Sequence, residues 1–248
     1  MFSATTYGWR TTTTAAVVAA AAVALGAAPS PARAALAPVH CYGEVATIVG
    51  SGAGDFIVGT AGRDVINSLG GDDTVSGNGG NDVVCGGADD DTVFGGAGAD
   101  KVAGNVGDDR LYGGDGDDAL EGFDGYDVVV GDAGDDRVDG GDGNDFLRDW
   151  GTGWLRGGPG NDVVRGSGGR DTVLGDEGND VLSGFGGADQ LLDADGWDTL
   201  LGGTGDDRLD ARNSTPFAAP DTVNGQGGFD ECAADQNDRV VSCELLLP

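Results

Sequence analysis

The chain has 248 residues, of which 50 are glycine, several times the usual share. Its 43 acidic residues outnumber its 13 basic residues, and the formal net charge is −30. A chain this acidic repels nucleic acid and anionic membranes, so we expect neither as a partner. Two interpretations remain, an acidic disordered chain or a fold that needs cations, and composition does not choose between them.

Residues 1–34 differ in composition from the rest of the chain. An apolar run from Ala15 to Ala28 follows Arg10 and is too short to span a bilayer. Ala32, Arg33 and Ala34 then give a small-x-small cleavage site. This arrangement predicts a secretory signal peptide over 1–34, with a membrane anchor as the alternative. We therefore expect a secreted, extracellular protein with no membrane span in the remainder.

The next segment, residues 35–50, is predicted to be an N-terminal cap. Ile48 keeps a nine-residue register with Ile57, but no aspartate precedes it as one precedes Ile57. A repeat structure needs such a closing element to cover its open edge.

Residues 51–210 repeat with a period of nine residues, apart from one slip of one residue. An aliphatic residue follows two positions after each repeated aspartate, and glycine usually lies two positions before it. The alternation around the aliphatic residue predicts a short strand, and the glycine-rich residues predict turns with positive φ. Asparagine and aspartate also tolerate positive φ, and we expect it at Asn78, Asn105, Asp132 and Asp176. Two strands and two turns then make a coil of 18 residues. The repeated aspartates are Asp55, Asp64, Asp73, Asp82, Asp91, Asp100, Asp109, Asp118, Asp127, Asp136, Asp145, Asp162, Asp171, Asp180, Asp189, Asp198 and Asp207.

Copies such as GGAGAD (95–100) and GGDGDD (113–118) resemble the G-G-x-G-x-D-x-U-x motif of RTX proteins, the haemolysin-type calcium-binding repeats. Their layout is similar to that of secreted actinobacterial members. The resemblance implies an all-β fold, a right-handed parallel β-roll. It also implies Ca²⁺ ions between turns one coil apart, held by the sixth-position aspartates in two rows. One row takes the aspartates from Asp55 in steps of one coil, and the other takes those from Asp64. Carboxylates and carbonyls are the ligands that calcium prefers; the alternative is that the aspartates only cap turns.

Some copies depart from the pattern. Residues 148–156 lack one residue and carry Gly153 in place of the aspartate, so we expect weaker calcium sites there. Trp150 and Trp154 in this segment either pack over a distorted coil or contact a sugar. The copies at 68–73 and 86–91 replace glycines and predict less regular sites.

The C-terminal segment, residues 211–248, is predicted to contain a linker over 211–220, then degenerate repeats and a cap. Asp221 and Asp230 continue the pattern weakly there. Four cysteines fit an oxidising compartment and allow three pairings. Because Cys85 follows a core position, it should face outward, within reach of the N-terminal cap. We therefore favour Cys41–Cys85 and Cys232–Cys243, as a preference among the three.

The motifs of common hydrolases are not found in the sequence. It contains neither H-E-x-x-H nor G-x-S-x-G, and His40 is its only histidine. We expect no enzyme, but a structural or binding module that folds on Ca²⁺ and meets a cell-envelope polysaccharide or a protein. The alternative is a polysaccharide-active enzyme, or an accessory to another extracellular enzyme, that uses the repeat carboxylates.

Overall fold

The computed structural model describes residues 39–212 and 220–247. The predicted signal peptide, and residues 213–219 of the predicted linker, lie outside them. Within the described ranges every regular element is a β-strand. No apolar helix of membrane-spanning length occurs in this part of the chain.

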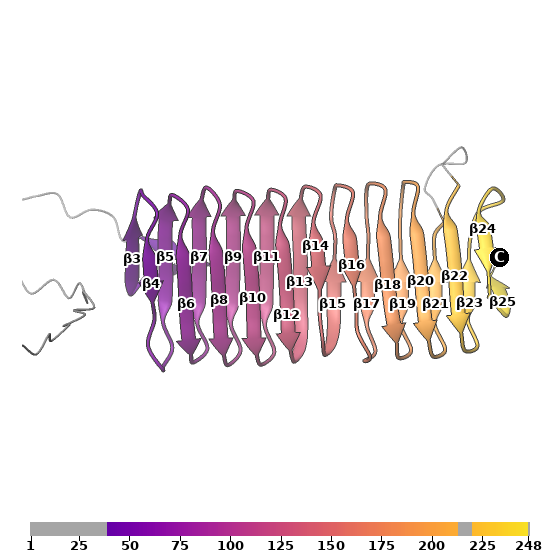
Figure 1. Ribbon diagram of the computed structural model, residues 1–248, viewed down its shortest axis with the longest axis horizontal. Coiled ribbons are helices and arrows are strands. Elements are labelled where there is room, and N and C mark those ends of the chain that lie inside the picture. Colours follow the sequence, from indigo (N-terminus) through magenta and orange to yellow (C-terminus); the bar gives the residue numbers. More distant parts are fainter. Residues whose placement is uncertain (1–38, 213–219, 248) are drawn as a thin grey trace, which may run out of the picture. The chain divides into compact units, whose positions relative to one another are not determined.

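Two parallel sheets make up nearly all of the structure (Figure 1). Neighbouring strands in a sheet are two apart in sequence, because the chain crosses from one sheet to the other after each strand. The predicted parallel β-solenoid is therefore confirmed. The 11-stranded sheet comprises β4 (Phe56–Val58), β6 (Thr74–Gly79), β8 (Thr92–Ala97), β10 (Arg110–Asp115), β12 (Val128–Ala133), β14 (Phe146–Arg148), β16 (Val163–Arg165), β18 (Val181–Gly186), β20 (Thr199–Thr204), β22 (Thr222–Gly227) and β24 (Arg239–Val241).

The second sheet has 12 strands and faces the first across the core. It comprises β3 (Ile48–Ser51), β5 (Val65–Gly70), β7 (Val83–Ala88), β9 (Lys101–Val106), β11 (Ala119–Asp124), β13 (Asp135–Asp142), β15 (Thr152–Arg156), β17 (Thr172–Leu174), β19 (Gln190–Leu192), β21 (Arg208–Asp210), β23 (Glu231–Ala233) and β25 (Leu245–Leu247).

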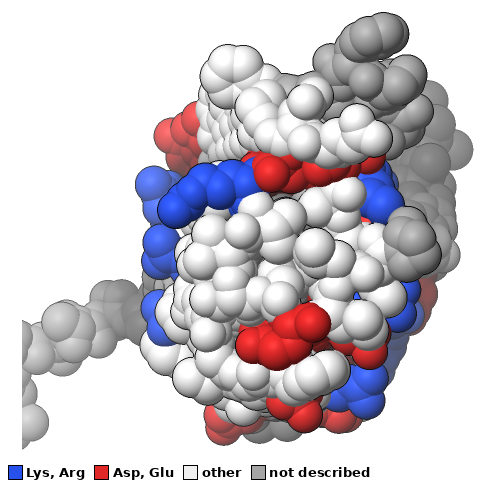
Figure 2. Space-filling model, turned by 90° about the vertical axis from the view of Figure 1, so that its right-hand side faces the viewer, with Lys and Arg blue, Asp and Glu red and all other residues white. Residues whose placement is uncertain are grey.

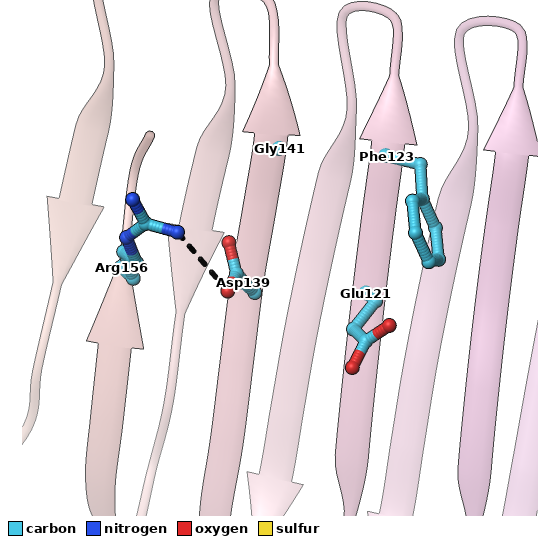
Figure 3. A pocket seen from close by; sticks show the side chains of 5 residues that line it. All are labelled: Glu121, Phe123, Asp139, Gly141 and Arg156. Carbon is cyan, nitrogen blue, oxygen red and sulfur yellow. Dashed lines mark ion pairs between the residues drawn. The ribbon is translucent and has the colours of Figure 1, made fainter. Parts of the chain in front are cut away.

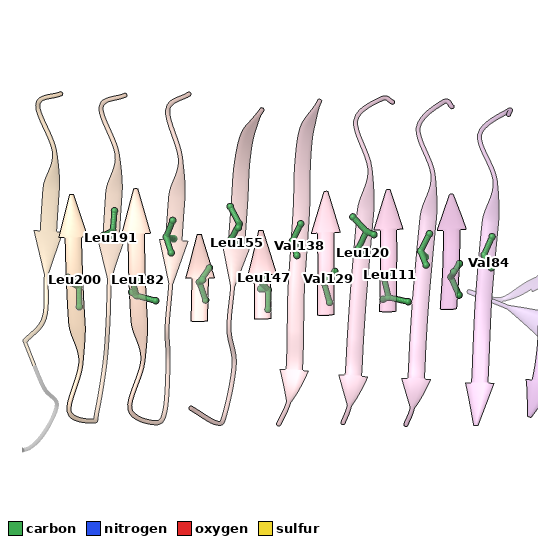
Figure 4. Close-up of a cluster of buried hydrophobic side chains, with 14 of the residues drawn as sticks. Val84, Leu111, Leu120, Val129, Val138, Leu147, Leu155, Leu182, Leu191 and Leu200 are labelled. Carbon is green, nitrogen blue, oxygen red and sulfur yellow. The ribbon is translucent and has the colours of Figure 1, made fainter. Parts of the chain in front are cut away.

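The core consists of the repeated aliphatic side chains (Figure 4). Leu111 pairs with Val129, and Leu120 with Val138, each 18 residues further along the chain. In the irregular coil Val138 pairs with Leu155, so the missing residue leaves the core register intact. Leu111, Leu120 and Leu155 are all fully buried. Each coil contributes only two such side chains, so stability has to come from stacking.

The N-terminal cover is a short antiparallel hairpin of β1 (His40–Cys41) and β2 (Glu44–Val45). With Ala46 it packs on Val65, Val83 and Ala103, which the alternation of the strands would otherwise leave on the outside of the second sheet. The favoured disulfide Cys41–Cys85 is present, with a Cα–Cα distance of 5.7 Å. Cys85 is buried because the hairpin covers it.

The segment predicted as degenerate repeats continues both sheets. Val223 pairs with Leu200 and Cys232 with Leu209, and both are fully buried. The second favoured disulfide, Cys232–Cys243, is also present and joins this core position to the last coil. Seen from this end, the surface is mostly uncharged (Figure 2). Leu245 and Leu246 contribute exposed apolar side chains to it.

Candidate calcium sites

The repeated aspartates lie in two rows, as the sequence predicts. In most coils the backbone N–H of one aspartate donates to Oδ1 of the aspartate one coil later, at 2.6–2.9 Å. Asp109, for example, accepts from Asp91 and donates to Asp127. Each carboxylate therefore bridges two stacked turns through one of its oxygens.

Both rows extend beyond the predicted set. Asp198 donates to Asp221 and Asp207 donates to Asp230, although the predicted linker interrupts the period between them. Asp230 in turn donates to Glu244 Oε2 at 2.8 Å. The sequence predicts only a weak continuation of the pattern at these C-terminal residues, because their spacing along the chain is irregular. This ladder of hydrogen bonds between the aspartates of consecutive coils depends on how the coils stack, not on a fixed spacing along the sequence.

The second carboxylate oxygen is available to a ligand at 14 of the 17 predicted positions. There Oδ2 is buried and has no hydrogen-bond partner within the described residues. A buried hydrogen-bond acceptor without a partner lowers the stability of the folded state by about 1–3 kcal/mol, and a charged acceptor lowers it by more. These positions are Asp73, Asp82, Asp91, Asp100, Asp109, Asp118, Asp127, Asp136, Asp145, Asp162, Asp180, Asp189, Asp198 and Asp207.

The space beside most of these oxygens is kept open by the first glycine of the repeat, although Asp73 and Asp198 have Ser68 and Asp193 at that place. A Cβ on Gly122 would collide with Oδ2 of Asp127 and with the carbonyl oxygen of Gly140. The corresponding glycines Gly104 and Gly113 border the same pair of groups in their own turns. A carboxylate and a carbonyl from consecutive coils thus converge on one gap, and this donor set suits calcium.

Three predicted positions are different, because the turn itself satisfies Oδ2. Asp55, Asp64 and Asp171 accept there from the backbone N–H of a serine or threonine four residues earlier, at 2.7, 2.6 and 2.8 Å. In most other turns the residue four positions before the aspartate has positive φ, for example 74° at Asn78. Its backbone N–H then does not donate to Oδ2. The sequence predicted 17 equivalent ligands, whereas the structure separates these three from the rest.

Positive φ at this position is only partly predictable. Asn78, Asn105, Asp132 and Asp176 adopt it as expected, with values from 71° to 82°. Leu69, Phe123 and Phe185 adopt it as well, at 81°, 78° and 72°. In the copy at 86–91 Asp89 takes φ 74° where glycine is usual, and Asp91 keeps an open Oδ2. The copy at 86–91 therefore keeps the usual turn, whereas in the copy at 68–73 the hydroxyl of Ser68 replaces the first glycine and donates to the carbonyl oxygen of Gly86 at 2.5 Å.

Two further aspartates occupy the place of the first glycine in their turns. Asp149 is fully buried in the irregular coil, and a Cβ on Gly131 would meet both its Oδ1 and Oδ2 of Asp136. It therefore supplies a carboxylate to the row where Gly153 cannot. Asp193 lies near Asp180 and Asp198. The sequence analysis did not predict either residue as a ligand, because an aspartate in place of a glycine indicates only a departure from the turn pattern. Its position within the repeat is the one feature of the sequence that could have pointed to this role.

Burial changes the acidity of the rows. It raises the pKa of Asp109, Asp118 and Asp145 to about 7, partly offset by the hydrogen bond from the preceding coil. Burial, followed by the charges of Asp198 and Asp180, raises the pKa of Asp193 to about 9. The folded rows therefore hold their negative charge poorly at neutral pH unless a cation compensates for it.

The outer face of the second sheet contains a pocket of about 210 Å³ (Figure 3). Arg156 Nη1 lies 3.8 Å from Asp139 Oδ2, and Arg156 also pairs with Asp176, while Glu121 is the second carboxylate that lines the pocket. Nearby, the guanidinium of Arg137 lies 3.9 Å from the ring centroid of Trp154, and Arg148 stacks in the same way on Trp150. These contacts support the interpretation that both tryptophans pack over the irregular coil.

The comparison with protein families agrees with this geometry. The model of the RTX calcium-binding nonapeptide repeat (4 copies) matches residues 49–84, 86–120, 112–147, 149–182, 165–192 and 192–214. No curated protein matches the chain. Because the matched ranges cover well over half of the sequence, the chain belongs to the RTX calcium-binding nonapeptide repeat family.

Proposed function

We propose that this protein is secreted, folds when it binds calcium, and then serves as a structural or binding module outside the cell. The observation that carries the proposal is the double row of buried carboxylate oxygens without partners. An unpaired buried charge is strongly unfavourable, and a core of two side chains per coil offers little to offset many of them. Bound Ca²⁺ would neutralise these carboxylates and link consecutive coils.

The chain's own residues set the selectivity that we propose. The first glycines hold the gap open, and carboxylate and carbonyl oxygens border it. Calcium accepts six to eight oxygens in flexible geometry, whereas magnesium requires a tight octahedron and keeps its water. We therefore propose that Mg²⁺ does not substitute for Ca²⁺ in folding.

Secretion rests on two features. The segment 1–34 has the composition of a signal peptide, and it lies outside the described residues. The two disulfides, Cys41–Cys85 and Cys232–Cys243, are of a kind that persists mainly in oxidising compartments. We propose a cell-envelope polysaccharide or a protein as the partner of the folded module.

We propose a binding or structural role rather than catalysis. General acid–base chemistry on a sugar requires two carboxylates at a cleft. Nearly all of the repeat carboxylates instead lie buried in the turns, and of the two carboxylates that line the outer pocket, Glu121 and Asp139, the second is paired with Arg156. This distribution supports a metal-binding use of the acidic residues.

A calcium titration tests the proposal. Calcium-free protein at pH 7.5 is titrated with CaCl₂ and followed by far-UV circular dichroism and differential scanning calorimetry, with MgCl₂ as the matched control. We expect the β spectrum and a rising melting temperature with Ca²⁺ only. Each site adds about 1.4 kcal/mol to the free energy of unfolding when the free calcium concentration is ten times the Kd of that site. An unchanged spectrum and melting temperature in excess chelator would show that calcium has no role in folding.

A further inference from the structure

Three carboxylates converge between two consecutive turns near the C-terminal end of the repeats. Asp180 belongs to one turn, and Asp193 and Asp198 belong to the turn one coil later. One carboxylate oxygen of each lies within 4.8 Å of the others. Asp180 and Asp198 are sixth-position residues of the repeat, but Asp193 stands where the repeat has glycine.

The hydrogen bonds of this cluster leave one oxygen of each residue unsatisfied. Asp198 Oδ1 accepts from the N–H of Asp180 at 2.9 Å, and Asp193 Oδ1 accepts from Ala194 at 2.9 Å. Oδ2 of all three is buried and has no hydrogen-bond partner within the described part of the chain. Asp180 and Asp198 are only 1% and 2% exposed, so water does not solvate them freely.

The surrounding backbone leaves room for a ligand rather than for a side chain. A Cβ on Gly175 would collide with Oδ1 of Asp193 and with Oδ2 of Asp180. In the regular turns the corresponding space is bordered by one carboxylate and a backbone carbonyl, as at Gly122. Here a second carboxylate replaces the carbonyl, so the same gap carries more negative charge.

We propose that Asp193 joins Asp180 and Asp198 as a third carboxylate ligand of one calcium ion, and that this site binds calcium more tightly than the sites formed by the regular repeat. The proposal rests on the proposed function, since it concerns one of its sites. Calcium affinity in proteins is set largely by the number of charged ligands and the rigidity of the site. The site therefore fills first as calcium rises and orders its two coils before the others.

Terbium(III) provides the probe, because it takes oxygen ligands like calcium and emits when a nearby tryptophan is excited. Trp197 precedes Asp198, and its backbone N–H donates to Oδ1 of Asn179, the residue before Asp180. Calcium-free protein is titrated with Tb³⁺ and then with competing Ca²⁺. We expect a class of high-affinity sites, the tight class, at which bound Tb³⁺ emits when tryptophan is excited. This emission should disappear in Trp197→Phe, which would place the tight class near Trp197.

Asp193→Gly restores the glycine of the repeat, and Asp193→Asn keeps the acceptor for Ala194 while removing the charge. We expect both variants to reach the wild-type β spectrum at saturating calcium, with the Kd of the tight class raised about tenfold or more. Asp132→Gly is the matched control. It also replaces an aspartate by glycine, at a position with φ 71° in another turn, and should leave the tight class unchanged.

The outcomes separate this proposal from the proposed function. If the protein folds on calcium but both Asp193 variants retain the tight class, the three-carboxylate site is refuted and the proposed function stands. The three-carboxylate site is also refuted if the wild type shows no tight class near Trp197. If calcium does not change the fold of the wild type, the proposed function fails as well. If Asp193→Gly does not fold, Asp193→Asn provides the test. Asparagine keeps the acceptor for the N–H of Ala194, so a residue that only caps the turn would leave the Kd of the tight class unchanged in this variant.

Discussion

Phe123 and Phe185 occupy a backbone conformation that glycine usually supplies. Their φ values are 78° and 72°, and a residue with a Cβ pays about 1–3 kcal/mol in that region. The stacked coils impose the conformation, because Phe185 pairs in register with Gly203, whose φ is also positive. Local preference is overridden by the neighbouring turns, which explains why sequence reasoning recognised Asn78 in this role but not the phenylalanines.

This strain predicts a stabilising substitution. Phe185→Gly should raise the free energy of unfolding by about 1 kcal/mol, because glycine adopts positive φ without a steric cost and Phe185 is 55% exposed. The matched control is Phe94→Gly, which should be destabilising, since Phe94 stacks on Tyr112 with ring centroids 5.0 Å apart. Chemical unfolding at saturating calcium measures both. Destabilisation of similar size by both changes would contradict the argument.

At the scale of the coil, the sequence predicted the strands and their register but only part of the sites. Aliphatic residues at a fixed period determine which side chains face inward, so pairs such as Leu111 and Val129 could be predicted. Asp149 and Asp193 could not, because their role depends on where a carboxylate lies relative to the next coil. The hydrogen bond that satisfies Oδ2 of Asp171 could not be predicted either, because it depends on the direction of the backbone N–H of Ser167.

The ladder also predicts that position along the solenoid determines the cost of losing a ligand. Asp118→Ala should remove one calcium site and cost about 1–3 kcal/mol, because Asp118 connects Asp100 and Asp136 and complete coils lie on both sides. Asp230→Ala should cost less, since Asp230 donates to Glu244 in the final coil and no complete coil of the described residues lies beyond it. Calcium binding stoichiometry and thermal unfolding compare the two. Equal losses would show that every turn contributes alike.

At the scale of the whole described body, nearly half of the acidic residues lie inside the turns rather than on the surface. Of the 43 acidic residues in the chain, 19 aspartates are buried in the turns. The formal charge alone suggested a strongly acidic surface, whereas the structure assigns much of that charge to the two rows. Folding is therefore coupled to whatever neutralises the rows, either a metal ion or a proton.

Protons should replace calcium in part, and this determines the pH dependence of the metal-free protein. Burial raises the pKa of Asp109 and Asp145 from 3.8 to about 7 and that of Asp180 to about 6. The folded state thus binds protons more tightly than the unfolded state between about pH 4 and pH 7, so its stability falls as the pH rises through this window. Below pH 4 the stabilisation is complete, and above pH 7 it is lost.

We therefore expect calcium-free protein to show the β spectrum near pH 4 and to lose it by pH 7.5, where added calcium restores it. Calcium binding at pH 6 should release protons, because the ligands must ionise, and calorimetry in two buffers of different ionisation enthalpy measures that number. In saturating calcium the melting temperature should change little between pH 7 and pH 8, which serves as the control. A metal-free fold that becomes more stable as the pH rises from 4 to 7 would contradict the burial of these carboxylates.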